Sequence, residues 1–352
     1  RKLLRPTKSL IDRWSSEIYS AEEFTVNAES ENLCPYELNK LLLKKAQIVI
    51  VPYVYFFEDF IRKYLLGWMD TTIDKIITIV DEAHNLPDWS REAASESLSV
   101  DSLHRASQES DKFGLLLGDG SPPTLFLDLV ESALKSLGEY HIPEGDDEGL
   151  LPSHIVSLDS EVPTFETEMM SLGKMTLYRL KQQSSDLSKM GQLIRQTLLE
   201  KGKRPRSYLG SVGDFLCRWL DSIESHTIRL VGNKPLRLEK VCLDPRVMTS
   251  FLDETAGVVM MSGTLSPLGM FRDLVGLKPE SKLERFGSIF PKENRLVRYV
   301  SDVSTSYREL NASPKVWVQL IDKLESIIDS FKGNIACLLY TSPSPRDVEE
   351  AR

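Results

Sequence analysis

The 352-residue sequence has few cysteines and no long apolar run, and each absence excludes a class of protein. Four cysteines are too few for a disulfide framework, and they suit a reducing, intracellular compartment. No stretch of about 18 apolar residues occurs, so we expect a soluble chain without a membrane span. The formal net charge of −9 argues against general binding to polyanions. Any contact with nucleic acid must therefore use local basic patches.

The sequence also lacks the phosphate-binding loop G-x-x-x-x-G-K-[ST], known as Walker A. It begins at Arg1 without a Met or a signal peptide. Near its end, residues 337–347 resemble the in-frame translation of a sequencing adapter, so residues 337–352 are expected to be an artefact that contributes nothing to the fold. We expect an internal fragment of a longer protein, inactive by itself because the loop is missing.

A short apolar run is followed directly by Asp81-Glu82-Ala83-His84. Residues 76–80 predict a central parallel strand that is covered on both faces, with the acids at its carboxyl end, where such sheets bind ligands. In a nucleotide hydrolase, Asp81 would hold Mg²⁺, usually through water, and Glu82 would orient the attacking water. His84 would be a neutral relay beside the γ-phosphate. An Asp-Glu pair that only caps the next helix is the alternative.

The neighbouring segments predict a doubly wound sheet. A helix begins at Pro35, residues 48–51 form a second apolar strand, and helical residues lead from there to the acidic strand end. Further on, residues 258–261 predict a third buried strand. Ser266 as N-cap and Pro267 as the first helical residue then begin a short helix.

Residues 89–240 have apolar side chains at helical spacing, interrupted by an acidic loop at residues 141–149. No strand-like apolar run occurs among them. They predict a helical domain inserted into the sheet domain. After it, residues 295–300 predict a strand, and a helix opens at Ser313-Pro314 and ends at Gly333. These two elements predict the start of a second α/β domain.

Hydroxyl side chains follow the third predicted strand, in Ser262-Gly263-Thr264. If they lie at the same edge of the sheet as the acids, their hydroxyls can bond the acidic cluster and link it to a neighbouring surface. A turn of small residues without a function is the equally weighted alternative.

Four motifs, taken together, resemble one family. They are Cys34-Pro35-Tyr36, Val-Pro-Tyr-Val-Tyr at residues 51–55, Val-Asp-Glu-Ala-His-Asn-Leu at residues 80–86 and Ser-Gly-Thr-Leu-Ser-Pro-Leu at residues 262–268. Their order and spacing over roughly residues 30–336 are similar to those of the XPD-type DNA helicases of superfamily 2, a group that includes the DinG-like helicases. In that family an arch domain is inserted between the last two motifs.

The resemblance implies an α/β fold: a partial RecA-like, doubly wound parallel sheet with an inserted, mainly α-helical arch domain. It implies ATP and Mg²⁺, with Asp81, Glu82 and His84 in motif II and Ser262, Gly263 and Thr264 in motif III. The implied divisions are 1–34 (remnant of an iron–sulfur domain), 35–92 and 243–290 (helicase domain 1), 93–242 (arch) and 291–336 (start of helicase domain 2).

The resemblance also implies a [4Fe–4S] cluster with Cys34 as one of its four ligands, the other three lying outside this sequence. By itself, a cysteine near a helix start is more often a small buried hydrophobe. Single-stranded and forked DNA are the implied substrates, with 5′→3′ polarity and Tyr36 and Lys40 as contacts. For the basic loop at residues 201–208, a solvated connection is slightly favoured over DNA binding.

The function that follows is part of an ATP-dependent DNA helicase, with DNA repair as the family's common role. Two alternatives stay open: a DinG-like helicase of another pathway, and a non-catalytic scaffold that keeps the fold. The expected compartment is the cytoplasm in an archaeon or the nucleus in a eukaryote. The sequence defines no protein partner.

Overall fold

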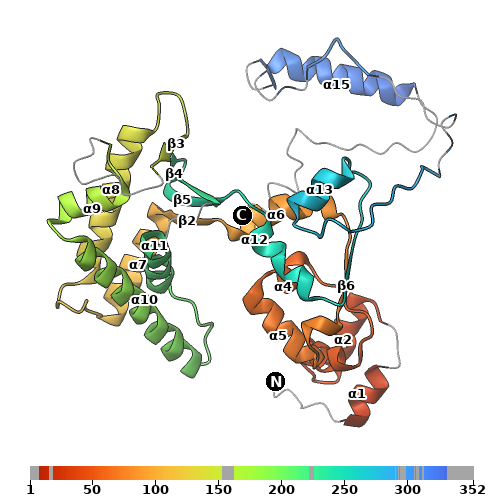
Figure 1. Cartoon of the computed structure of the whole chain (residues 1–352), viewed down its shortest axis with the longest axis horizontal. Helices are drawn as coiled ribbons and strands as arrows, with labels where there is room; N and C mark the ends of the chain where they lie inside the picture. The colour runs from red at the N-terminus through yellow and green to blue at the C-terminus, as the bar shows by residue number, and fades with distance from the viewer. Residues whose placement is uncertain are drawn as a thin grey trace. The chain divides into compact units, whose positions relative to one another are not determined.

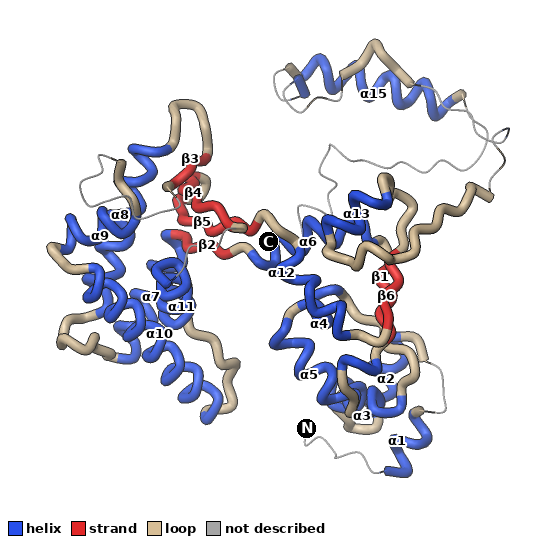
Figure 2. The backbone as a smooth tube through the Cα atoms, in the orientation of Figure 1, coloured by secondary structure: helices blue, strands red, loops and turns tan. Residues whose placement is uncertain are grey.

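The computed structural model describes residues 8–15, 19–152, 162–221, 226–289, 291, 293, 299–304, 306, 309–310 and 313–330. The chain divides into two compact units, Arg1–Leu283 and Glu284–Arg352. In the first unit, one group of helices accompanies a parallel strand pair, and a second group accompanies a separate antiparallel sheet (Figures 1 and 2).

The helices described in the first unit are α1 (Lys8–Trp14), α2 (Ala21–Ser30), α3 (Pro35–Leu42), α4 (Tyr53–Phe57), α5 (Asp59–Met69), α6 (Leu86–Ala94), α7 (Val100–Phe113), α8 (Pro123–His141), α9 (Phe165–Gly173), α10 (Leu177–Glu200), α11 (Tyr208–Asp221), α12 (Arg246–Thr249) and α13 (Leu268–Leu274). Short 3-10 helices are η1 (Leu43–Lys45), η2 (Ile73–Lys75), η3 (Ala83–Asn85) and η4 (Ser250–Glu254). The strands are β1 (Ile77–Val80), β2 (Glu96–Ser99), β3 (Glu148–Leu151), β4 (Thr227–Asn233), β5 (Leu236–Cys242) and β6 (Gly257–Met260).

Strands β1 and β6 pair in parallel although the whole inserted domain separates them in the chain. Their register runs from Ile77 opposite Gly257 to Val80 opposite Met260. This pairing confirms the prediction that both apolar runs are neighbouring strands of one sheet. The apolar core beside it contains Phe57, Val80, Ala83, Leu86, Phe251 and Leu252.

The prediction that β1 is covered on both faces is wrong. Thr78 and Val80 are buried, whereas Ile77 is 68% exposed and Ile79 is 64% exposed. Side chains alternate between the two faces of a strand, and the described residues cover only one face of this one. Strand β1 therefore has more apolar side chains than the described residues around it bury.

The second predicted strand, at residues 48–51, is also not formed. These residues belong to no helix or strand, and Ile48 and Ile50 are 83% and 93% exposed. A strand needs backbone partners, and within the described part of the chain β1 and β6 pair only with each other. Apolar composition alone therefore did not determine the structure of this segment.

The inserted domain is mainly helical, as predicted, but it also holds strands that the sequence did not indicate. Helices α7 to α11 are accompanied by an antiparallel sheet in the order β2-β5-β4-β3. The acidic loop at residues 141–149 ends inside β3, and β4 occupies residues 227–233, where helical spacing was expected. These strands were missed because they alternate charged and apolar residues, as in the Leu-Arg-Leu-Glu-Lys-Val-Cys of β5, rather than forming an apolar run.

Helices α10 and α11 cross at glycines. A Cβ atom added at Gly213 would lie 2.2 Å from the backbone nitrogen of Ser188. One added at Gly191 would lie 2.0 Å from the Cα atom of Gly210. Side chains at these positions would force the helices apart, so the close crossing depends on the glycines.

Two helix starts were predicted from Ser-Pro pairs, and one is displaced by one residue. Helix α13 begins at Leu268 with Pro267 as its N-cap, and the side chain of Ser266 makes no capping bond. Helix α15 (Pro314–Asp329), in the second unit, begins as predicted, with the Ser313 hydroxyl accepting the N–H of Lys315 at 3.3 Å.

Several predictions fall wholly or partly on residues that the structure does not describe. The predicted strand at residues 295–300 is described only at its last two residues, where no strand is assigned. The predicted helix end at Gly333 and the tail at residues 337–352 lie outside the described residues.

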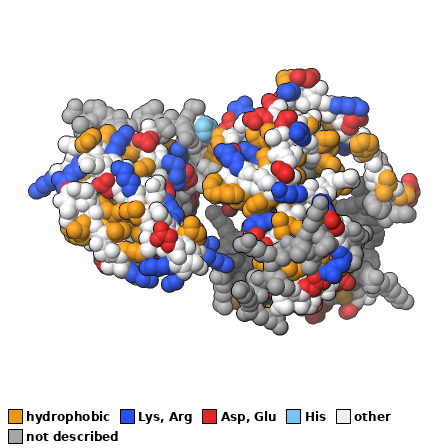
Figure 3. All heavy atoms as spheres, turned by 90° about the horizontal axis from the view of Figure 1, so that it is seen from below, with side chains coloured by type: hydrophobic (Ala, Val, Ile, Leu, Met, Phe, Trp, Pro, Cys, Tyr) orange, Lys and Arg blue, Asp and Glu red, His pale blue; other side chains and the backbone are white. Residues whose placement is uncertain are grey.

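The surface of the described residues carries both signs of charge. Figure 3 shows lysine and arginine side chains interspersed with acidic and apolar ones over the visible face. The absence of one dominant field agrees with the moderate net charge. Among the described helices, none has both the length and the apolar content needed to cross a bilayer.

Candidate active site

The carboxyl ends of β1 and β6 form a common rim. Beyond the strand ends, the Met261 N–H donates to the carbonyl of Val80 at 3.0 Å. The Ala83 N–H donates to the carbonyl of Met261 at 3.0 Å. These bonds extend the parallel pairing by one residue and bring the Asp-Glu-Ala-His turn against the Ser-Gly-Thr turn.

Side chains from the two turns meet at this rim. The Ser262 hydroxyl donates to Glu82 Oε2 at 3.2 Å and lies 2.7 Å from His84 Nδ1. His84 Nδ1 is also 3.2 Å from Glu82 Oε2. Glu82, His84 and Ser262 are therefore brought together as predicted, and we call these three residues the rim triad.

Ser262 links the two turns. Its oxygen accepts the Thr264 N–H at 3.3 Å. When the Ser262 proton is donated to Glu82, the Ser262 oxygen accepts from His84 Nδ1–H; the role of Nδ1 follows from the tautomer of the ring.

Glu82 is held in a strained backbone conformation. It has φ 46° and ψ 40°, in the left-handed region that a non-glycine residue enters at a cost of about 1–2 kcal/mol. The Asp81 carboxylate offsets part of this cost by accepting the Glu82 N–H at 2.9 Å. Strain of this kind is typical of functional turns, where it presents a side chain in one direction.

Tyr53 supports the same turn, a contact that the sequence analysis did not predict. Its hydroxyl donates to the carbonyls of Asp81 and Glu82, at 2.7 and 3.1 Å. Burial, with the nearby Asp81 and Glu82 charges, raises the pKa of Tyr53, so it keeps its proton and stays a donor. Its ring also packs against Phe57 and Trp89. The sequence did offer one signal for this contact: a tyrosine stands at position 53, where packing in the core would need only the ring of a phenylalanine.

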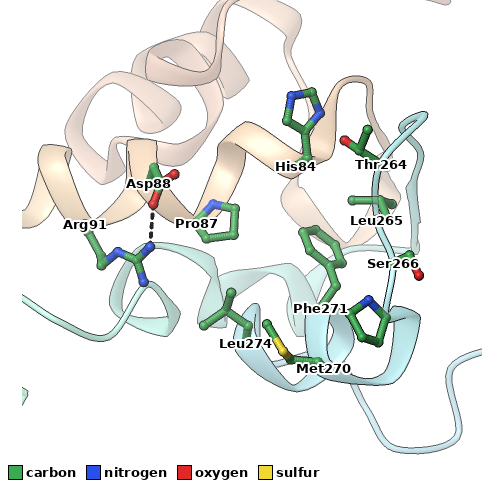
Figure 4. Close-up of a pocket in the computed structure, with 11 residues that line it drawn as sticks. His84, Pro87, Asp88, Arg91, Thr264, Leu265, Ser266, Met270, Phe271 and Leu274 are labelled. Atoms are coloured by element: carbon green, nitrogen blue, oxygen red, sulfur yellow. Dashed lines mark hydrogen bonds and ion pairs between the residues drawn. The ribbon is translucent and has the colours of Figure 1, made fainter. Parts of the chain in front are cut away.

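A hollow of about 200 Å³ adjoins the rim between α6 and α13. Figure 4 shows His84 at its upper side, the ion-paired Asp88 and Arg91 on one wall, and Met270, Phe271 and Leu274 opposite. Thr264, from the Ser-Gly-Thr turn, lines it as well. A side chain at Gly263 would meet nothing within 4 Å, so the space beside that glycine is open.

The rim suits Mg²⁺ by its donor chemistry. Asp81 and Glu82 are exposed carboxylates, the hard oxygen ligands that Mg²⁺ prefers. No group of three or more potential metal ligands occurs among the described residues. Mg²⁺ needs no such group, because it keeps several waters and binds through one or two carboxylates together with phosphate oxygens.

A [4Fe–4S] cluster does not fit the described residues by themselves. Cys34 is the N-cap residue of α3, and a cluster requires four ligands. The other described cysteines lie elsewhere: Cys217 is in α11, where burial raises its pKa, and Cys242 ends β5. Within the described residues, therefore, no cluster site can be assembled around Cys34.

Tyr36 and Lys40 lie together at a second surface. Lys40 Nζ lies 4.4 Å from the centroid of the Tyr36 ring and 4.9 Å from that of Trp68. It is also ion-paired with Glu37 at 2.9 Å. In the basic loop at residues 201–208, Tyr208 accepts a hydrogen bond from Arg105 at 3.2 Å.

Comparison with known proteins finds two family models and several relatives that are similar to this chain. The DEAD_2 family model matches residues 4–103, and the "Helical and beta-bridge domain" model matches residues 156–309. The ATP-dependent DNA helicase CHL1 of Saccharomyces cerevisiae (strain YJM789) is 24% identical over 314 residues, which cover 84% of this chain and 35% of that protein. The Fanconi anemia group J protein homolog of Gallus gallus is 37% identical over 78 residues, covering 22% of this chain and 6% of that protein.

Among solved structures, one titled XPD_Helicase is similar, with a TM-score of 0.45, 24% identity, and coverage of 73% of this chain and 39% of that chain. The chain spans about a third of the length of the CHL1 helicases that it matches.

The fold is mixed α/β, with a parallel strand pair and a mainly helical inserted domain that also holds an antiparallel sheet. Two family models match on either side of residues 104–155, and over most of its length the chain is similar to ATP-dependent DNA helicases.

Proposed function

We propose that this chain forms part of an ATP-dependent DNA helicase, in which the rim triad belongs to the ATP-hydrolysing site. The observation that carries the proposal is the bonding of Glu82 and His84 to Ser262, from a turn about 180 residues away in the chain. A turn that only caps the next helix would not require this partner. Relatives named as ATP-dependent DNA helicases support the same function.

In this proposal, each residue at the rim has its own task. Glu82 accepts a proton from, and orients, the water that attacks the γ-phosphate. Ser262 keeps the Glu82 carboxylate in place by donating to one of its oxygens, which leaves the other free for the water. Asp81 holds Mg²⁺ and, by capping the Glu82 N–H, keeps the turn in its strained form. Bound Mg²⁺ neutralises the charge that develops on the phosphate oxygens.

The same bonds supply a route for coupling. The Ser-Gly-Thr turn leads into α13, and it bonds to Glu82 through Ser262. A change in the charge or position of the Glu82 carboxylate therefore acts directly on this turn. We propose that Ser262, Gly263 and Thr264 transmit the nucleotide state to the parts of the protein that grip DNA.

The proposal also includes the DNA contacts, the direction of translocation and the cluster ligand that the resemblance implies. Tyr36 and Lys40 contact single-stranded or forked DNA, and translocation runs 5′→3′. Cys34 is one cluster ligand, the others being supplied from outside the described residues. The proposed domain boundaries are those of the sequence analysis, and DNA repair, in the nucleus of a eukaryote, is the proposed role.

The test is ATP hydrolysis in a longer form of the protein that includes a phosphate-binding loop. Glu82→Gln should lower DNA-stimulated kcat by about 100-fold or more, with ATP affinity retained, because only the general base is lost. Glu92→Gln, an exposed site on α6, is the matched control and should leave kcat unchanged. Residues 1–352 alone should hydrolyse no ATP. Equal rates for wild type and Glu82→Gln in the longer protein, or DNA-stimulated hydrolysis by residues 1–352, would overturn the proposal.

A further inference from the structure

Helix α5 carries a row of aromatic side chains on its surface. Phe60, Tyr64 and Trp68 are spaced four residues apart, so they lie on one face of the helix. Phe60 is 70% exposed and Tyr64 is 51% exposed. Large aromatic side chains gathered at an exposed face are unusual without a binding partner.

The row continues onto a second helix. The ring centroids of Phe60 and Tyr64 are 4.9 Å apart, and those of Tyr64 and Trp68 are 6.2 Å apart. From Trp68 the next ring is Tyr36 of α3, again at 6.2 Å, and Tyr36 is 56% exposed. Four rings from two helices therefore follow one another, and we call Phe60, Tyr64, Trp68 and Tyr36 the aromatic row.

A hollow of about 410 Å³ opens at the α3 end of the aromatic row. Tyr36 and Trp68 line it, and Lys40 is the charged side chain among the described residues of its lining. The hydrogen bond to Glu37 raises the pKa of Lys40, so the ammonium group stays charged. Glu37 is exposed and Lys40 is partly exposed, so their ion pair is weak and a phosphate can replace Glu37 at little cost.

We propose that the aromatic row and Lys40 bind single-stranded nucleic acid, with bases stacked on the rings and a phosphate at Lys40. The inference rests on the proposed helicase function and adds Phe60, Tyr64 and Trp68 to the contacts at Tyr36 and Lys40. Successive exposed rings beside a cation are the usual chemistry for binding a strand without sequence preference. A protein partner would gain from the apolar rings but would not require the cation in the hollow.

The experiment measures binding of a fluorescently labelled oligo(dT) of about 15 nucleotides to residues 1–352 by anisotropy. Tyr64→Ala should weaken binding about tenfold, whereas Tyr64→Phe should bind like wild type, because stacking needs the ring and not the hydroxyl. Tyr178→Ala, in α10, removes a ring that is more exposed than Tyr64 and is the control. Since Tyr64 is half exposed, the variant should fold, and Trp68→Leu supplies a second test of the row.

Salt dependence tests the role of Lys40 separately. Lys40→Gln should reduce the slope of log Kd against log salt by about 0.7, the value expected for one phosphate contact in a single strand. A slope equal to that of wild type would overturn the phosphate contact.

The outcomes separate this inference from the proposed function. If wild type binds the oligonucleotide and Tyr64→Ala and Trp68→Leu bind equally well, the aromatic row is not the site, although DNA binding by the chain stands. If wild type binds no oligonucleotide but self-associates through the row, and Tyr64→Ala abolishes that association, the row is a protein interface and the inference is wrong. ATP hydrolysis at Glu82 is measured independently of either result.

Discussion

The buried ion pair between Arg229 of β4 and Glu166 of α9 should be among the most sensitive positions of the inserted domain. Arg229 Nη1 donates to Glu166 Oε1 at 2.9 Å, and the two side chains are only 8% and 3% exposed. The same guanidinium donates to the carbonyl of Trp219 and lies 4.4 Å from the centroid of the Trp219 ring. One side chain thus connects β4 with α9 and α11.

Removing either side chain of this ion pair leaves the other charge buried without a partner of opposite charge. Arg229→Met should destabilise the domain by about 3–5 kcal/mol, the usual cost of breaking a buried pair. At 1.4 kcal/mol per tenfold change, this is roughly a 100- to 4,000-fold increase in the opening equilibrium. In Arg229→Met/Glu166→Leu no charge is left buried. The remaining cost should be about 1–2 kcal/mol, mainly for the Trp219 carbonyl that loses its donor.

Hydrogen–deuterium exchange is the suitable assay, because it reports the opening of α11 and β4 without requiring the whole chain to unfold in one step. Lys135→Met is the control: it breaks the exposed pair with Glu131 and should change stability by less than about 0.5 kcal/mol. The reasoning is refuted if Arg229→Met costs less than about 1 kcal/mol, or if the double variant is as unstable as the single one.

Three further predictions concern the helix crossing, pH and the strained turn. Gly213→Ala should lower the melting temperature, because the added Cβ would overlap α10. Gly67→Ala, whose added Cβ would meet nothing within 4 Å, should raise stability by about 0.5–1 kcal/mol. Thermal unfolding of the two variants tests both expectations. Hydrogen bonds from Ser121 hold the pKa of Asp119 below its ordinary value. The stability that the ionised Asp119 contributes is therefore present above about pH 4 and is lost as the pH falls below that value. The difference in unfolding free energy between wild type and Asp119→Asn, measured with urea, should shrink at low pH. A difference that does not change with pH would contradict this. Tyr53→Phe should slow DNA-stimulated ATP hydrolysis in the longer protein several-fold, with little change in thermal stability; an unchanged kcat would remove its positioning role.

The rim could be predicted from the sequence because two short-range signals coincided. Apolar runs followed at once by carboxylates or hydroxyls mark the carboxyl ends of parallel strands, and such ends share one edge of a sheet. That rule brought Glu82 and Ser262 together without knowledge of the residues between them. The helices of the inserted domain were predicted for a similar reason, since their apolar spacing is regular.

The features that were missed depend on tertiary surroundings. Residues 48–51 are as apolar as a strand, but a strand exists only where a backbone partner is available. Strands β4 and β5 carry charged residues that form ion pairs within β5 and with helix α9, so their composition resembles that of a surface helix. The left-handed conformation of Glu82 and its support by Tyr53 are properties of a folded turn, and no local pattern of residues encodes them.

The central claim is that the Asp-Glu-Ala-His and Ser-Gly-Thr turns meet at one rim, and the ring nitrogens of His84 report this directly. With ¹⁵N-labelled histidine, NMR follows the two ring nitrogens of His84. The account predicts that the His84 ¹⁵N signals shift in Ser262→Ala but not in Ser102→Ala. His84 signals that Ser262→Ala leaves unchanged would contradict the account.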